Sequence, residues 1–280
     1  MTARIRIIPG PGRHTWFGLL TVVSILSIAC GAGGDETTER SFEVGPSPRL
    51  VVGAGHGDVL VQTGPVGMIA VLSVVTNRDN VDLDVDAAGD VVTVASVTRS
   101  SRNLFGDSAQ GAVDSTFTVP PETAIEVGIA DGTVNVDGIQ AGGVITAGNG
   151  IVTLRNVAGD FSGGVGSGDV GISGGTGSFR FTTGVGSIRF EGDLIAGGSN
   201  RFETGTGDVI VAISTDASVE IDATVTRGSL SSELSLTGES STRSGTGRRL
   251  SGTLGDGGAV LVMTVGTGSV EISDRPPPNR

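Results

Sequence analysis

Glycine returns at an 18-residue interval in the second half of the sequence, and each of these glycines opens a short alternating apolar segment. Gly132 precedes Val134 and Val136, and Gly150 precedes Val152. A unit of this length is too short to bury its own apolar face, so it must stack on its neighbours. Later steps lengthen to 21 residues. The repeat predicts an all-β chain folded as a parallel β-solenoid, with coils of about 18–21 residues and less regular N-terminal strands.

The glycines of this register are expected to be structural turn residues. Glycine accepts positive φ and close backbone approach at little steric cost, which suits a corner between two strands. Side chains then alternate along each strand, so Val152 is expected to face the core and Thr153 the solvent. The predicted turn positions are Gly132, Gly150, Gly168, Gly186, Gly207, Gly228 and Gly268.

The N-terminal segment has the composition of a targeting element. Arg4, Arg6 and Arg13 precede a mostly apolar stretch of 14 residues, 16–29, which is too short to span a bilayer comfortably. This segment resembles a bacterial lipoprotein signal peptide, in which Cys30 becomes the lipidated first residue of the mature chain. Alternatively, Cys30 is a buried or free thiol beside an ordinary secretory cleavage site.

Composition indicates which parts of the rest of the sequence are ordered and which are flexible. Residues after Cys30 are small and polar, with order expected to begin near Phe42, and the polar segment Thr98–Ser115 is expected to be an exposed loop. The predicted organisation is a lipoprotein signal peptide at 1–29, a flexible tether at 30–41, an N-terminal β region of the solenoid at 42–127, regular repeats at 128–273 and a Pro-rich tail at 274–280.

The charge of the sequence restricts its partners. Its formal net charge is −12, with 30 acidic residues against 18 basic ones, all of them arginine. An acidic surface of this kind argues against nucleic acid or anionic lipid as a ligand. The predicted partners are therefore the membrane, through the lipid anchor, and an unknown protein or glycan.

The inventory of reactive side chains is small. Beyond the leader, His56 is the only histidine, and the sequence has no tyrosine or lysine. A multi-histidine metal site is thus excluded, and we predict no metal, cofactor or catalytic residue. A Ser-His-Asp site would have to use His56, which is expected to be a solvent-facing turn residue.

Carboxylate chemistry is the remaining catalytic alternative. Asp169 and Asp208 occupy the same place in repeats two apart, so we expect about 10 Å between them, too far to share an ion. Weak calcium binding by acidic corners stays open. Arg180, Arg189 and Arg201 form either a basic patch near several acids or an ordinary solvated salt-bridge face.

Several segments, in the order in which they occur, resemble a known protein family. A Val-Pro-Pro step at Val119–Pro121, an extended Ala124–Val127 and strand openings such as Asp131–Val134 resemble the bacterial family labelled "putative adhesin", a β-strand-repeat family of unknown function. The resemblance implies a surface or envelope protein without a defined catalytic residue set. The sequence departs from the pattern between Arg227 and Gly266, where we expect irregular structure.

These observations lead to a functional hypothesis. We expect a non-catalytic, lipid-anchored protein of the bacterial surface or envelope that acts as a binding or adhesion scaffold, with no nucleic-acid partner. Two alternatives remain: a carboxylate-dependent carbohydrate-active enzyme, and a partner module in envelope signalling.

Overall fold

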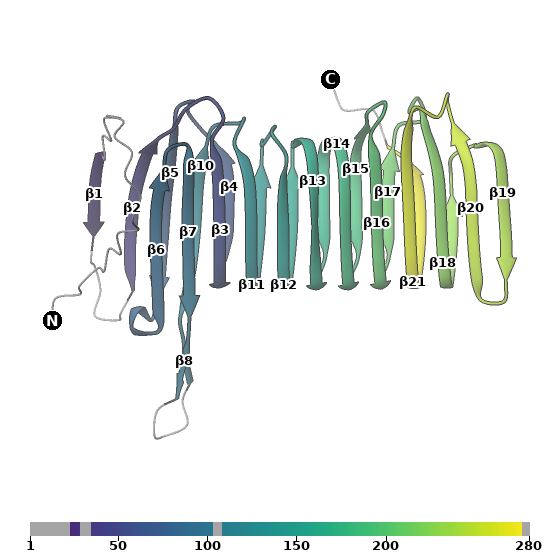
Figure 1. Ribbon diagram of the computed structural model, residues 1–280. Helices are drawn as coiled ribbons and strands as arrows, with labels where there is room; N and C mark the ends of the chain where they lie inside the picture. The colour runs from purple at the N-terminus through teal and green to yellow at the C-terminus, as the bar shows by residue number, and fades with distance from the viewer. Residues whose placement is uncertain (1–22, 29–34, 103–107, 276–280) are drawn as a thin grey trace, which may run out of the picture.

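The computed structural model describes residues 23–28, 35–102 and 108–275. In these ranges 19 strands join one sheet, two more form a separate hairpin, and the only helical element is the short 3₁₀ turn η1 (Arg78–Asn80). The prediction of an all-β chain is confirmed. Figure 1 shows the strands side by side along the molecule, with the earliest at one end and the β18–β20 region at the other.

The strands fall into three consecutive groups. The first comprises β1 (Val23–Ile28), β2 (Glu36–Glu43), β3 (Arg49–His56), β4 (Val59–Thr63), β5 (Met68–Thr76), β6 (Val81–Ala88), β7 (Val91–Thr98), β8 (Ser100–Arg102), β9 (Ser108–Gln110) and β10 (Ala112–Val119). The second comprises β11 (Ala124–Asp137), β12 (Gly143–Arg155), β13 (Ala158–Ser167), β14 (Val170–Val185), β15 (Ile188–Leu194), β16 (Ser199–Thr206) and β17 (Val209–Ile213). The third comprises β18 (Val219–Ser232), β19 (Thr237–Ser244), β20 (Gly247–Leu254) and β21 (Ala259–Asp274).

Strands of the second group pair in parallel at the spacing of the sequence repeat. Gly132 on β11 lies beside Gly150 on β12, and Val152 lies beside Val170 on β14. The longer step of 21 residues also matches a parallel pair, that of Ile188 with Val209. The glycine register therefore identifies which residues are neighbours on adjacent strands.

The prediction of a parallel β-solenoid is nevertheless wrong. The parallel strands close as a five-stranded barrel, and many strands lie outside it. Antiparallel pairs join β2 to β5, β5 to β10, β6 to β7 and β18 to β20. The spatial order also departs from the chain order, because β21 lies between β16 and β17 on one side and β18 on the other (Figure 1).

Short turns explain the antiparallel pairs. Only Gly89 and Asp90 separate β6 from β7, and only Gly245 and Thr246 separate β19 from β20. Both glycines have positive φ, 61° and 60°. A two-residue connection returns the chain antiparallel, whereas a parallel pair needs a longer crossover. The irregularity expected between Arg227 and Gly266 is this second hairpin, with its partner strand β18.

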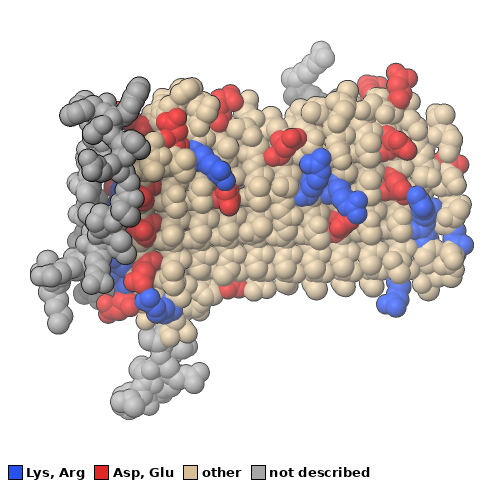
Figure 2. Space-filling view, in the orientation of Figure 1, with Lys and Arg blue, Asp and Glu red and all other residues tan. Residues whose placement is uncertain are grey.

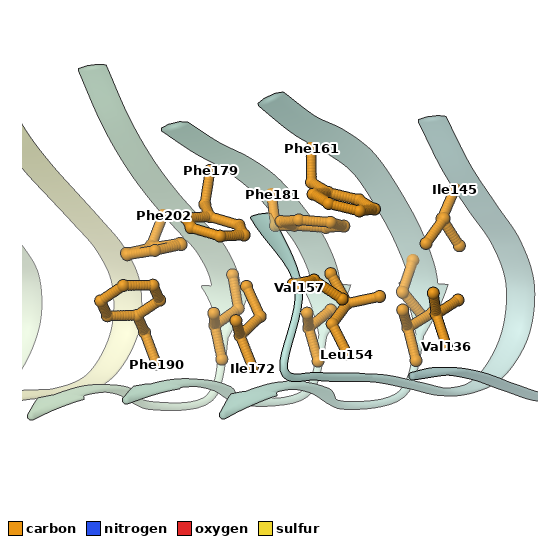
Figure 3. Close-up of a cluster of buried hydrophobic side chains, with 14 of the residues drawn as sticks. Val136, Ile145, Leu154, Val157, Phe161, Ile172, Phe179, Phe181, Phe190 and Phe202 are labelled. Carbon is orange, nitrogen blue, oxygen red and sulfur yellow. The ribbon is translucent and has the colours of Figure 1, made fainter. Parts of the chain in front are cut away.

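The core is mostly aliphatic, and four of its phenylalanine rings form a chain of stacked and tilted neighbours. Phe161 stacks on Phe179 at 6.1 Å between ring centroids, and Phe190 contacts both Phe179 and Phe202 at 5.4 and 5.3 Å. All four rings are buried. Figure 3 shows Phe161, Phe179 and Phe202 on one side of the core, and Phe190 on the other side together with side chains such as Leu154. Ring pairs of this geometry add about 0.5–1.5 kcal/mol each to burial of their area.

Two segments predicted to lack order contain strands. β2 begins at Glu36, inside the stretch 30–41 for which a flexible tether was expected, and its eight residues all pair with β5. The expected loop Thr98–Ser115 holds the β8–β9 hairpin and the start of β10, where Val113 is buried. Alternation of polar and apolar residues is weak in both segments, so the sequence does not predict strands there. They form strands because each pairs with a neighbouring strand. Cys30 lies outside the described residues.

Candidate functional site

The predicted turn glycines lie side by side in one column across the parallel strands. The seven positions have φ values from 139° to 143°. At Gly150, for example, a Cβ atom would overlap the carbonyl oxygen of Gly132 on the neighbouring strand. Only glycine combines this φ with so close a backbone approach. The column therefore holds the backbone together and contains no reactive side chain.

The carboxylates considered for catalysis bind backbone amides. Asp169 accepts a hydrogen bond from the N–H of Ser187 at 2.7 Å, and Asp208 accepts one from the N–H of Ser269 at 2.7 Å. Ser187 stands between the two acids, because its hydroxyl accepts a bond from the N–H of Asp208 at 3.2 Å. Asp169 and Asp208 thus stabilise successive strand openings. In the part of the chain that the structure describes, no group of three or more His, Cys, Asp or Glu residues could hold a metal ion.

His56 belongs to a polar row next to the glycine column. Its Nδ1 atom lies 3.1 Å from Oδ2 of Asp131, and the side-chain amide of Asn149 donates to Oδ1 of the same carboxylate at 2.7 Å. These three residues are direct neighbours on β3, β11 and β12. Within the described ranges His56 has no hydrogen bond to a hydroxyl group, so the His–Asp pair is not extended to a nucleophile.

The structure separates the arginines considered as a basic patch. Arg180 and Arg201 are direct neighbours on β14 and β16, and Glu203 forms an ion pair with Arg201. Arg189 lies instead on β15, beside Gly171. The Arg201–Glu203 pair is half exposed, and such surface pairs contribute about 0–1 kcal/mol. The three arginines therefore do not form one basic patch: Arg201 is in a solvated ion pair, and Arg189 lies on a different strand.

An outer surface with an uncharged central row extends over five neighbouring strands, and we call it the broad face. Its centre is a row in which each residue lies beside the next, and its members are Gly53, Gly128, Thr146, Gly164 and Thr182 on β3, β11, β12, β13 and β14. At about 4.8 Å between strands the row is about 19 Å long. Figure 2 shows uncharged side chains as a continuous band along this side, with charged groups at separate points.

The glycines of the broad face are not required by the fold. A Cβ atom at Gly53 would meet no atom within 4 Å, and at Gly164 its nearest neighbour would be the carbonyl oxygen of Thr182 at 3.5 Å. At Gly128 the nearest atom would be the Thr146 hydroxyl at 3.4 Å. None of the three has positive φ. Glycine inside a strand costs roughly 0.5–1 kcal/mol relative to alanine, and these three positions carry that cost without a backbone reason.

The repeat of glycines in the sequence indicates corners, so it does not reveal this face. A signal for it exists in the alternation of side chains. Gly53 stands between Val52 and Ala54, and Gly128 between Val127 and Ile129, so a glycine at the outward position is flanked by inward apolar residues. That pattern distinguishes a glycine on a flat outer surface from one at a corner.

Comparisons with known proteins give similar structures only. No family model and no curated protein matches the sequence. A putative cell adhesion protein from Clostridium sporogenes is 11% identical, with a TM-score of 0.41, over 85% of this chain and 100% of that one. A putative adhesin from Bacteroides fragilis is 11% identical, with a TM-score of 0.35, over 84% and 96%. A putative lipid binding protein from Parabacteroides distasonis is 11% identical, with a TM-score of 0.36, over 88% and 98%.

Two of these three names agree with the label that the sequence resemblance gave. At this identity and these TM-scores the likeness carries no argument about activity or ligand. A search of the described residues for membrane-spanning helices found none that is long and apolar enough.

Proposed function

We propose that this chain is a non-catalytic binding protein of the bacterial cell surface that uses the broad face to contact a partner. The observation that carries the proposal is the row of glycines at Gly53, Gly128 and Gly164, where the fold has room for larger residues. A row whose side chains are no larger than threonine permits close approach of an extended partner along its whole length. The polar, uncharged threonines of the row offer hydroxyl groups to a protein or glycan.

The engagement of the acidic side chains also favours binding over catalysis. Asp169 and Asp208 accept hydrogen bonds from the backbone of the next strand, and His56 is paired with Asp131. Groups that hold the fold in this way are poorly placed to act as a general acid and base. A cleft with convergent acids, which a carbohydrate-active enzyme requires, would contradict the proposal.

Anchoring through Cys30 is the second part of the proposal, and its support is the leader sequence. Strand β2 begins at Glu36, six positions after Cys30. Six extended residues span at most about 20 Å, so a lipid on Cys30 would hold the β-sheet body close to the membrane. A partner would then be bound at the envelope surface and not at a distance from it.

The experiment compares attachment by two surfaces of the same molecule. The full chain and its Gly128→Arg variant are produced in a bacterial host, and binding to intact cells and to isolated envelope is measured. The control is Gly171→Arg, because Gly171 lies on β14 away from the broad face and a Cβ atom there would meet no atom within 4 Å. We expect attachment to be lost for Gly128→Arg and kept for Gly171→Arg.

Equal attachment of both variants would overturn the role of the broad face. If the retained partner is a signalling protein that binds the broad face, the envelope-signalling alternative gains over adhesion. Capture of a glycan on the same face supports a scaffold for adhesion.

A further inference from the structure

A hydroxyl-lined hollow lies at the end of the molecule where β18, β20 and β19 pair in this order. Its volume is about 380 Å³. Gly247 on the middle strand β20 forms the floor between Thr224 and Thr226 on β18, one wall, and Thr242 and Ser244 on β19, the other wall; Arg248 and Arg249 of β20 also line the hollow. The hollow is distinct from the broad face and contains none of the residues that the sequence singled out for chemistry.

The pairing of these strands shows that the side chains share one surface. Val225 is buried, so its neighbours Thr224 and Thr226 point outward. Arg249 lies opposite Thr224 on one side and opposite Thr242 on the other, which places all three on the same outer surface. Gly247 lies opposite Ser244 and has no side chain, so the hollow opens between the two walls.

Asp222 balances the charge of Arg249 at this site. Arg249 donates from Nε to Oδ1 of Asp222 at 3.1 Å and from Nη2 to Oδ2 at 2.7 Å. This two-point geometry fixes the guanidinium plane and neutralises it. Of its five N–H donors, three have no partner among the residues that the structure describes. Arg249 therefore offers directed hydrogen-bond donors with its charge neutralised. Arg248, which also lines the hollow, donates from Nη1 to the carbonyl oxygens of Gly228 and Thr246 and has no carboxylate partner among the described residues.

The fold leaves the hydroxyl groups of the walls free. Across the described ranges, the side-chain oxygens of Thr224, Thr226, Thr242 and Ser244 make no hydrogen bond within the chain. A hydroxyl group both donates and accepts, and threonine adds a methyl group. Four such groups around a floor of glycine match a ligand that presents hydroxyl groups and short C–H surfaces at close spacing.

We propose that this hollow binds one unit of a neutral carbohydrate. The volume is at the lower end of the range for small-molecule sites, which suits a single sugar ring with the rest of an oligosaccharide outside. The net charge of −12 on the whole chain disfavours an anionic ligand, and Asp222 neutralises Arg249. Arg248 is then the one arginine lining the hollow that has no carboxylate partner among the described residues. The hydroxyl walls and the fixed guanidinium supply the polar contacts that orient the ring.

The test is a titration of the full chain, in detergent, with neutral oligosaccharides of glucose, mannose, xylose and N-acetylglucosamine, followed by calorimetry and by NMR shifts. We expect at least one to bind, and Gly247→Val to weaken that binding by at least about tenfold because its side chain fills the floor. A Cβ atom at Gly247 would lie 3.3 Å from the carbonyl oxygen of Ser244, a tight contact that a small shift of the turn relieves. Arg249→Gln should weaken binding to a similar extent through loss of the fixed donors.

Gly171→Val is the matched control, since it adds the same side chain at an open position far along the sheet. It should bind as the unmodified chain does, and circular dichroism should show all variants folded. Absence of binding to every neutral sugar, or binding that Gly247→Val leaves unchanged, would overturn the proposal. So would binding restricted to oligogalacturonate or inorganic phosphate. A negative result in this titration would not contradict cell attachment by the broad face, because the Gly128→Arg experiment measures a different surface.

Discussion

Oδ1 of Asp208 accepts two hydrogen bonds from Ser269, one from its backbone N–H at 2.7 Å and one from its hydroxyl at 2.6 Å, although 61 residues separate the two in sequence. The contact joins the opening of β17 to the equivalent point of β21. These two strands are neighbours in the sheet, although β18, β19 and β20 lie between them in the sequence. A side chain that sequence analysis regards as a possible catalytic acid thus holds β21 in register.

Removal of this acceptor should therefore reduce stability. We expect Asp208→Ala to destabilise the chain by about 1–3 kcal/mol, because the Ser269 amide loses a charge-assisted partner. In a domain of this size that lowers the melting temperature by roughly 2–4 °C per kcal/mol. Asp208→Asn keeps an oxygen acceptor and should lose less. Thermal unfolding followed by circular dichroism decides the matter, and identical melting curves for the three proteins would show that the contact contributes nothing.

The alternation along β12 makes a second prediction. Val152 is fully buried, whereas Thr153 is partly exposed on the outer surface. Val152→Asp would place an unpaired charge in the aliphatic core, at a cost of several kcal/mol, and Thr153→Asp would leave its charge in water. We expect the first variant to be unfolded or insoluble and the second to melt close to the original chain. Equal melting temperatures would mean that the assigned faces are reversed.

Attachment to the membrane is a third prediction, and it concerns Cys30. The basic leader and the apolar stretch that ends at Ala29 predict that this residue carries lipid. Cys30→Ser should move the protein from the membrane fraction to the soluble fraction, and metabolic labelling with a fatty acid should be lost with it. Unchanged detergent partitioning and labelling of the variant would contradict lipidation.

Much of the local pairing could be predicted, and the topology could not. The 18-residue spacing corresponds to direct neighbours such as Gly132 and Gly150, because in-register parallel strands impose one spacing on all their residues. The two-residue turn at Gly89 and Asp90 was overlooked, although a glycine-containing turn between alternating segments is a hairpin signal. The position of β21 could not be found locally, since it depends on pairing between residues far apart in sequence.

The candidate site was less predictable than the fold. The corner glycines and the broad-face glycines are the same residue type, and they differ in φ and in the distance to a carbonyl group on another strand. Likewise, the partner of Asp169 is the amide of Ser187, and no side-chain pattern in the sequence reports a backbone amide. Sequence indicated which residues could do chemistry, whereas the structure shows which of them are already used.

Two adjacent glycines on β13 test the difference between a glycine that the backbone requires and one that it does not. At Gly163 a Cβ atom would overlap the carbonyl oxygen of Ile145, while at Gly164 the nearest atom, the carbonyl oxygen of Thr182, would be 3.5 Å away. Gly163→Ala must therefore push two paired strands apart, and we expect it to destabilise the chain by about 1–3 kcal/mol. Gly164→Ala should be neutral or stabilising by about 0.4–1 kcal/mol, because it restricts the unfolded chain without strain.

The two variants have the same composition and differ only in position, so each is the control for the other. Their melting temperatures should fall on opposite sides of that of the original chain, or at least differ by several degrees. If Gly164→Ala is as destabilising as Gly163→Ala, the fold does require glycine on the broad face. The glycine row would then no longer support a binding surface.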